Sequence, residues 1–175
     1  MLLGLLAACI ATVASIELQH HLASHTRPFL DPALHIQLAD PSLPLGWDRL
    51  GSFPSDTATL YFSLATVLLL ESRILGGVGF AWTVIQFGLV RVALGWHYPS
   101  DIAGSLVLGP GCVLLLTRLR ALEAALERWL ERQEGRFYLV DALFCLFLAD
   151  AYTLFSGARG VVHVLGMLRA IVFGQ

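Results

Sequence analysis

The 175-residue chain is 57% hydrophobic and only 14% charged, and its mean hydropathy is +0.72. Soluble domains carry about 25% charged residues, so this composition excludes a disordered chain and an ordinary soluble enzyme. A net charge of −2 gives no basic surface for nucleic acid, so no nucleic-acid partner is expected. The composition therefore predicts a single integral membrane domain over residues 1–175, with the bilayer as its main surroundings.

Apolar stretches separated by short polar segments predict an all-α, polytopic bundle of about five or six membrane spans of roughly 20 residues each. In chain order, the predicted spans are residues 2–16, 57–70, 74–90, 102–116 and 137–155, with a shorter final segment at 161–173. The stretch 118–136 instead mixes charged residues with leucines at helical spacing, which predicts an amphipathic helix on the membrane surface.

The arginines predict which way the bundle faces. The chain has no lysine, and six of its eleven basic residues fall on one face. These are Arg73 and five arginines between residues 118 and 136. Because basic loops stay on the cytoplasmic side, this face is expected to be cytoplasmic. The polar stretch 20–55 and the segment 91–101 are then expected together on the outer or periplasmic face.

The sharpest cluster on the predicted outer face is Arg91, His97 and Asp101. Pro99 suits the first turn of a helix, because its missing N–H would be unpaired there in any case. Such a helix would place Asp101 in its first turn and His97 just before it. Asp101 could then accept a hydrogen bond from one imidazole nitrogen and leave the other nitrogen as a nucleophile or base.

Two further clusters on the same face complete a predicted anion site. Pro54 and Ser55 open a helix for which Ser55 is a suitable N-cap. A helix N-terminus together with the guanidinium groups of Arg27 and Arg91 suits a phosphate group. Each element alone also has an ordinary structural explanation, such as an interfacial anchor or a helix start. An ionisable cluster at a membrane boundary nevertheless predicts a functional site.

The same residues resemble the motifs of the type 2 phosphatidic acid phosphatase (PAP2) superfamily. The pattern of that family is a Lys, six residues and Arg-Pro, then Pro-Ser-Gly-His, then Ser-Arg, five residues, His, three residues and Asp. Arg27-Pro28 and Pro54-Ser55 match parts of the first two motifs, and Arg91, His97 and Asp101 match the third at the right spacing. The segment 95–104 is similar to the bacterial membrane branch, which includes undecaprenyl-pyrophosphate phosphatases.

The resemblance implies a role for each matching residue. His97 would attack phosphorus and form a phosphohistidine, and Asp101 would orient it. The phosphate would be held by Arg27 and Arg91, helped by Ser55 and the backbone at Asp56. No metal or other cofactor is implied. The substrate would be a lipid phosphate or an isoprenyl diphosphate in the bacterial inner membrane. The resemblance covers residues 20–116 and leads us to expect further helix before the first motif, or the last two segments in its place.

The sequence departs from the family pattern at four positions. His20 stands where the family has the first-motif Lys, and Val90 replaces the Ser before Arg91. In the second motif, Asp56 replaces Gly, which resembles a variant in the undecaprenyl-pyrophosphate phosphatase branch, and Thr57 occupies the place of the histidine that protonates the leaving group. A general acid contributes about 10²–10⁴-fold to a reaction rate, most where the leaving group is an alkoxide. These departures predict a preference for lipid diphosphates over phosphomonoesters, with His20, His21 or His25 as candidate proton donors.

Two other interpretations fit the sequence. A catalytically degenerate member of the family would keep the fold and bind lipid phosphate, or serve as a scaffold. Alternatively, His20, His35 and His97 could be haem or metal ligands, although their spacing differs from known ligand motifs.

Overall fold

The computed structural model describes residues 2–22, 26–36 and 51–119, together with residues 122, 124, 125 and 128. The chain divides into two compact units, residues 1–123 and 124–175, and the architecture below is that of the first. The predicted surface helix 118–136 lies almost wholly outside the described residues, and the predicted spans after residue 136 lie entirely outside them. The assignment of residues 1–175 to one domain stays a prediction.

Every regular element in the described residues is a helix, which confirms the predicted all-α class. The long helices are α1 (Leu2–His21), α2 (Asp56–Glu71), α3 (Arg73–Thr83) and α5 (Pro99–Thr117). A π-helical segment, η4 (Val84–Leu89), and the short α4 (Val90–Ala93) continue α3 into one rod. Two 3-10 turns, η1 (Pro28–Leu30) and η2 (Pro32–Leu34), follow α1.

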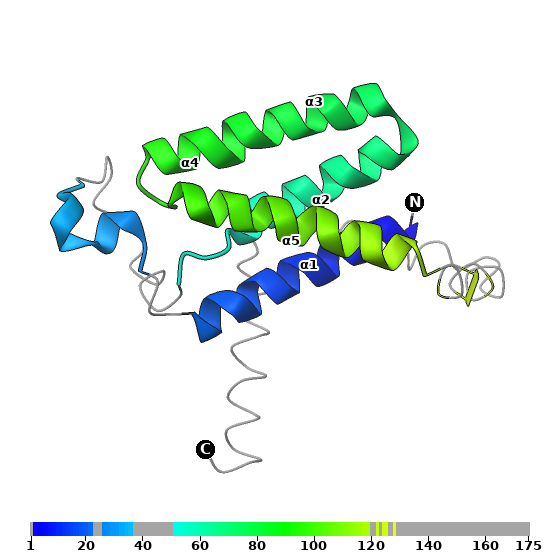
Figure 1. The fold of residues 1–175 in the computed structure, drawn as a ribbon, viewed down its shortest axis with the longest axis horizontal. Coiled ribbons are helices and arrows are strands. Elements are labelled where there is room, and N and C mark those ends of the chain that lie inside the picture. The colour runs from blue at the N-terminus through cyan, green and yellow to red at the C-terminus, as the bar shows by residue number, and fades with distance from the viewer. Residues whose placement is uncertain are drawn as a thin grey trace, which may run out of the picture. The chain divides into compact units, whose positions relative to one another are not determined.

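Helix α2 lies at the centre of the bundle and packs against α1, α3 and α5 (Figure 1). Its 16 residues are mostly buried and rise only about 24 Å at 1.5 Å per residue. Small side chains let these helices approach, as in the buried cluster of Ala7, Val67 and Val113. Because α2 is enclosed by the other helices, it provides an inner support for the segments at both of its ends.

Helix α1 is longer than the predicted span 2–16, because it continues through Glu17 to His21. The extension carries four polar residues, of which Glu17, His20 and His21 are exposed and Gln19 is fully buried. The predicted span ends at Ile16, where the charged and polar residues begin. The helix continues past it because Gln19 has hydrogen-bond partners inside the protein, as described below.

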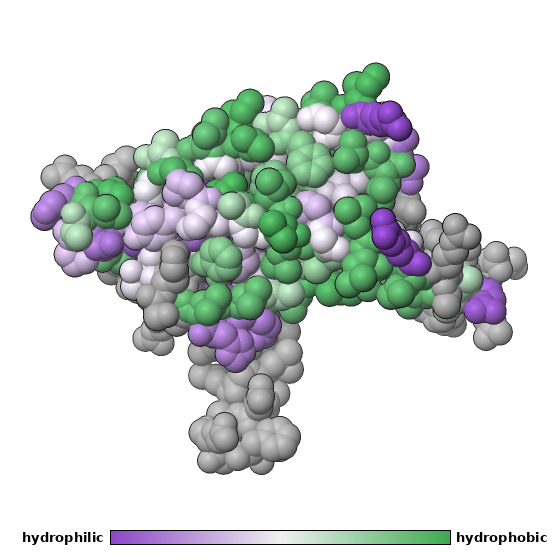
Figure 2. All heavy atoms as spheres, in the orientation of Figure 1, coloured by the Kyte–Doolittle hydropathy of each residue, from purple (hydrophilic) through white to green (hydrophobic). Residues whose placement is uncertain are grey.

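Three helical stretches are long and apolar enough to cross a membrane: Leu3–His21, Arg73–Ala93 and Pro99–Thr117. Their outer faces carry large apolar side chains that are more than half exposed, among them Ile74, Val78 and Val107. Figure 2 shows hydrophobic residues over much of the described surface, with strongly hydrophilic residues toward the ends of the helices. The chain is therefore an integral membrane protein, and the total of five or six spans stays a prediction.

The segments that carry the sequence motifs meet at one end of the bundle. The backbone N–H of Gly51 donates to the Gln19 carbonyl at 3.1 Å, which joins the end of α1 to the segment before α2. The Phe29 N–H donates to the Gly95 carbonyl at 3.0 Å, which joins η1 to the segment between α4 and α5. The structure thus brings Arg27, residues 51–57 and residues 91–101 together at one end of these helices. The position of this end at the outer membrane face stays a prediction.

Candidate active site

His97 lies in the short segment between α4 and α5, and only 1% of its surface is exposed. The chain turns there at Gly95, whose φ of 70° favours glycine. Helix α5 then begins as predicted, with Tyr98 as its N-cap and Pro99 in its first turn. The turn at Gly95 and the helix start at Tyr98 together fix the backbone on both sides of His97.

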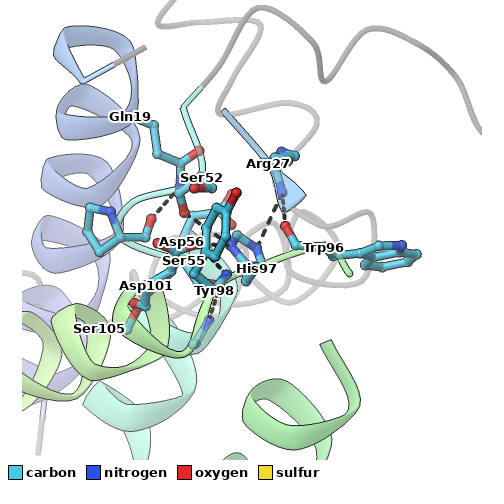
Figure 3. Close-up of polar contacts among 12 residues, drawn as sticks. Gln19, Arg27, Ser52, Ser55, Asp56, Trp96, His97, Tyr98, Asp101 and Ser105 are labelled. Carbon is cyan, nitrogen blue, oxygen red and sulfur yellow. Dashed lines mark hydrogen bonds and ion pairs between the residues drawn. The ribbon is translucent and has the colours of Figure 1, made fainter. Parts of the chain in front are cut away.

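Two acceptors face the Nδ1 atom of His97 (Figure 3). The Ser52 backbone carbonyl lies 3.0 Å from Nδ1, and Asp101 Oδ2 lies 3.3 Å from it. Asp101 is fully buried and its Oδ2 also accepts from the Tyr98 N–H at 2.8 Å, while its carboxylate makes a side-chain hydrogen bond with Ser52. The Asp101 carboxylate is thus held by the helix start and by the segment before α2.

A donor faces the other imidazole nitrogen. Arg27 Nη1 lies 3.3 Å from His97 Nε2 and donates to the Trp96 carbonyl at 3.4 Å. Because a carbonyl and a carboxylate only accept, Nδ1 carries the hydrogen. Because a guanidinium only donates, Nε2 presents its lone pair. The surroundings of the ring therefore select the tautomer in which Nε2 is free to act as a nucleophile or base.

The surroundings of His97 also favour its neutral form. Burial lowers the pKa of His97 below its ordinary value of 6.5, and the positive charges of Arg27 and Arg91 lower it further. The hydrogen bond to Asp101 and the charge of Asp56 act in the opposite direction but do not outweigh burial. At neutral pH the imidazole is therefore unprotonated and nucleophilic.

Arg91 is 8% exposed and lies in α4, just after the π-helical segment. Its guanidinium carbon lies 5.9 Å from the centroid of the Phe87 ring and 5.5 Å from that of the Trp96 ring. Both distances fall within the range of a cation–π contact. A π-helical turn shifts the faces of the residues that follow it, and such turns are frequent at functional sites. Two aromatic rings thus fix the guanidinium at the end of this rod.

The start of α2 forms a third side of the site. Ser55 is the N-cap, as predicted, and its hydroxyl accepts from the Ala58 N–H at 3.4 Å. Asp56 Oδ1 accepts from the Thr57 N–H at 2.8 Å and from the Thr57 hydroxyl at 3.3 Å. The carboxylate therefore occupies the backbone N–H of Thr57. The assignment of the Asp56 backbone to phosphate binding stays a prediction.

The profile of the PAP2 superfamily matches residues 1–124, which is most of the chain. The chain belongs to the PAP2 superfamily. Three curated relatives share parts of this region. Bacitracin transport permease protein BcrC of Bacillus licheniformis is 38% identical over 60 residues, which are 33% of this chain and 28% of that protein. Undecaprenyl-diphosphatase BcrC of Bacillus subtilis (strain 168) is 34% identical over 86 residues, which are 47% of this chain and 38% of that protein.

A third relative is the putative undecaprenyl-diphosphatase YbjG of Escherichia coli (strain K12). It is 33% identical over 98 residues, which are 53% of this chain and 44% of that protein. The matched regions thus span less than half the length of each of these relatives. No solved structure gives a significant match to this chain.

Within this PAP2 protein, the structure brings most of the motif residues together but leaves one apart. Arg27, Arg91, Ser55 and Asp101 all lie around His97 or on the segments that contact it. His20, at the family's lysine position, is instead exposed at the end of α1. Its assignment to phosphate binding stays a prediction. Among the described residues, no three His, Cys, Asp or Glu side chains are grouped so that they could hold a metal ion.

The structure also places in the site residues that the motif analysis did not select. Ser52 contacts His97 through its backbone carbonyl, a group that every residue has, so the residue type does not predict this contact. Gln19 and Ser105 reach the segment 51–55 from α1 and α5, and neither belongs to a motif. Trp96 lies directly before His97, in the segment 95–104 that resembles the bacterial membrane branch. An aromatic residue so close to Arg91 in the sequence could have predicted the cation–π contact.

Proposed function

We propose that this PAP2 protein is a membrane lipid phosphatase or diphosphatase in which His97 is the nucleophile. The observation that supports this most strongly is the setting of the imidazole: acceptors at Nδ1, a guanidinium at Nε2, and a pKa lowered by burial. A neutral histidine of fixed tautomer beside two arginines is suited to attack on a phosphorus atom whose oxygens the arginines bind.

In the proposed reaction, a terminal phosphate binds between Arg27 and His97, and Arg27 exchanges its contact with Nε2 for the phosphate oxygens. Nε2 attacks the terminal phosphorus, so that an N–P bond forms and the bridging P–O bond breaks. The leaving oxygen departs with the electron pair as a lipid phosphate. A water molecule then attacks phosphorus, the N–P bond breaks, and inorganic phosphate leaves with the neutral imidazole restored.

The residue at position 57 favours a diphosphate as the substrate. The Thr57 hydroxyl is a weak acid and lies against Asp56 Oδ1, so it does not protonate a leaving oxygen. A lipid phosphate leaves as a stabilised anion, whereas the alkoxide of a phosphomonoester needs a proton. An isoprenyl diphosphate substrate is also supported by the names of two relatives, undecaprenyl-diphosphatase BcrC and putative undecaprenyl-diphosphatase YbjG.

The proposed site lies at the outer face of the bacterial inner membrane. Its segments join the ends of apolar helices, so a lipid headgroup at the membrane surface could reach it while its chains stay in the bilayer. The sequence pattern that predicts six arginines on the opposite face, Arg73 among them, supports this orientation.

The test is phosphate release by the purified, full-length protein in detergent, comparing undecaprenyl diphosphate with phosphatidic acid. We expect release from the diphosphate to exceed release from phosphatidic acid, and we expect His97→Ala to abolish both. Release that His97→Ala leaves unchanged would contradict the proposal. A folded protein that releases phosphate from neither lipid would favour the second candidate, a non-catalytic lipid-phosphate binder or scaffold, which Thr57 and the exposed His20 support.

A further inference from the structure

The segment 51–55, which supplies the Ser52 contacts to His97 and Asp101, is itself anchored on two sides. On the α5 side, the Ser105 hydroxyl donates to the Ser55 carbonyl at 2.9 Å, and the Ser55 N–H donates to the Asp101 carbonyl at 3.4 Å. These contacts fix the end of the segment that enters α2. The other side is fixed by α1.

The α1 side is anchored by a glutamine inside a membrane-spanning helix. Gln19 Nε2 donates to the Pro54 carbonyl at 2.7 Å (Figure 3). The Ser15 hydroxyl donates to the same carbonyl at 3.2 Å. The Gln19 backbone carbonyl also accepts from the Gly51 N–H. A Cβ at position 51 would lie 2.5 Å from the Leu22 carbonyl oxygen, so the segment touches the end of α1 as closely as a glycine allows.

Gln19 is an unusual residue to bury in such a helix. Its exposed fraction is 0%, and a buried amide is destabilising unless it is hydrogen-bonded. Its one side-chain donor contact among the described residues goes to a segment 35 residues away and not to its own helix. Thr12, on the same helix, is buried as well, but its hydroxyl donates only to the Ala8 carbonyl one turn earlier. Gln19 therefore holds a distant segment of the chain, whereas Thr12 bonds only within its own helix.

We propose that Gln19 is a positioning residue for His97. Its amide holds the Pro54 carbonyl and thereby fixes Ser52, whose carbonyl and side chain hold the Nδ1 of His97 and the carboxylate of Asp101. Helix α1 thus sets the orientation of the imidazole although it contributes no group that touches the phosphate. The inference rests on the proposed function, because it assigns Gln19 a part in the reaction at His97.

The test compares Gln19→Met, which keeps the length of the side chain and removes its amide, with Thr12→Val as the matched control. Misplacement of a reacting group by about 1 Å costs on the order of 10²-fold in rate. We therefore expect Gln19→Met to lower kcat for undecaprenyl diphosphate by about 10- to 100-fold with KM unchanged. Ser15→Ala should have a smaller effect of the same kind, and Thr12→Val should keep the wild-type kcat.

A second measurement separates positioning from loss of structure. In protein labelled with ¹⁵N-histidine, the Nδ1–H signal of His97, assigned by its loss in His97→Ala, should be present in wild type and Thr12→Val. In Gln19→Met this Nδ1–H signal should shift, or disappear because the proton exchanges with water. The thermal unfolding temperature of Gln19→Met should stay that of wild type. An active wild type with equal kcat in Gln19→Met and Thr12→Val overturns the inference alone. A wild type that releases no phosphate overturns the proposed function and this inference with it.

Discussion

The two sides of the His97 ring differ in how closely they keep the arrangement that the family motifs imply. The Nδ1 side is complete: the Ser52 carbonyl and the Asp101 carboxylate accept from the ring, and the Tyr98 N–H and the Ser52 side chain hold that carboxylate. At Nε2, Arg27 is present, but Thr57 stands at the position of the family's acid, and His20, at the lysine position, is exposed. Under the proposed function, the chain thus keeps the surroundings of the nucleophile and differs from the family in groups that would act on the phosphate and the leaving oxygen.

Under the proposed function, this difference separates two tasks. A fixed, neutral imidazole beside guanidinium groups would serve the attack on phosphorus. Protonation of the leaving oxygen is a separate task, and it becomes unnecessary when the leaving group is a stabilised anion. A change confined to the Nε2 side would thus narrow the range of substrates without abolishing attack.

The largest effect is expected on the Nε2 side, where Arg27 faces the reacting atoms. Removing one group that stabilises developing charge costs about 10²–10³-fold in kcat, and we expect a loss of this size for Arg27→Ala. Arg27→Lys keeps the charge without the two-pronged guanidinium and should lose less. Steady-state kinetics with undecaprenyl diphosphate test both variants. Equal losses would mean that the geometry of the guanidinium has no part in the effect.

On the Nδ1 side, we expect Asp101→Asn to lower kcat by a smaller factor. In serine proteases the corresponding change costs about 10⁴-fold because it allows the wrong tautomer. Here the Ser52 carbonyl still accepts from Nδ1, so we expect a loss on the order of 10²-fold. A full loss of activity, with the protein still folded, would show that the Ser52 contact does not hold the tautomer.

The comparison of the two sides is sharpened by restoring the missing acid. Thr57→His should raise hydrolysis of phosphatidic acid on the order of 10-fold more than hydrolysis of the diphosphate, because only the alkoxide needs the proton. Thr57→Asn, which is polar but does not titrate, is the control and should show no such selectivity. An equal gain on both substrates in Thr57→His would contradict the explanation based on the leaving group.

A few-fold change in KM is expected when the cation–π contact between Arg91 and Trp96 is removed. A partly exposed cation–π contact contributes about 0.5–1 kcal/mol, so Trp96→Leu should raise KM roughly 2- to 5-fold and leave kcat close to that of wild type. The measurement is the concentration dependence of phosphate release. A large fall in kcat with KM unchanged would instead assign Trp96 to the transition state.

The smallest effect is expected from pH near neutrality. Because the pKa of His97 is lowered below 6.5, its protonated form appears only at lower pH. We expect kcat/KM to stay level from pH 7 to 6.5 and to fall only below that range. Asp101→Asn removes an interaction that raises the pKa of His97, so its acid limb should move to still lower pH. An acid limb above pH 6.5 would contradict the lowered pKa.

The same shift links pH to stability. In the unfolded chain His97 takes up a proton as the pH falls through 6.5, whereas the folded protein takes it up only at a lower pH. The free energy of unfolding should therefore decrease as the pH falls from 6.5 toward the pKa of the folded protein.

Much of the fold and of the reacting centre could be predicted from the sequence because the signals are local. Hydropathy predicts the helices, and the proline after Tyr98 and the serine before Asp56 predict the starts of α5 and α2, which the structure confirms. Arg91, His97 and Asp101 lie in α4, in the short segment after it and in the first turn of α5, so their proximity also follows from local geometry.

The contacts between distant segments could not be predicted in the same way. Gln19 and Pro54 are 35 residues apart, and Ser52 and His97 are 45 residues apart. Both contacts involve backbone carbonyls, which leave no trace in the sequence. The inward direction of Gln19 likewise depends on how α1 packs against α2 and α5, so a sequence pattern that ends the span at Ile16 does not predict it.

The measurement that tests the account most directly is the identification of the phosphoenzyme. The protein would be mixed with undecaprenyl diphosphate carrying a labelled terminal phosphate, quenched in alkali, in which phosphohistidine survives, and mapped by mass spectrometry. The account predicts one labelled residue, His97, and no label in His97→Ala. Label on another residue, or turnover by His97→Ala at the wild-type rate, would contradict it.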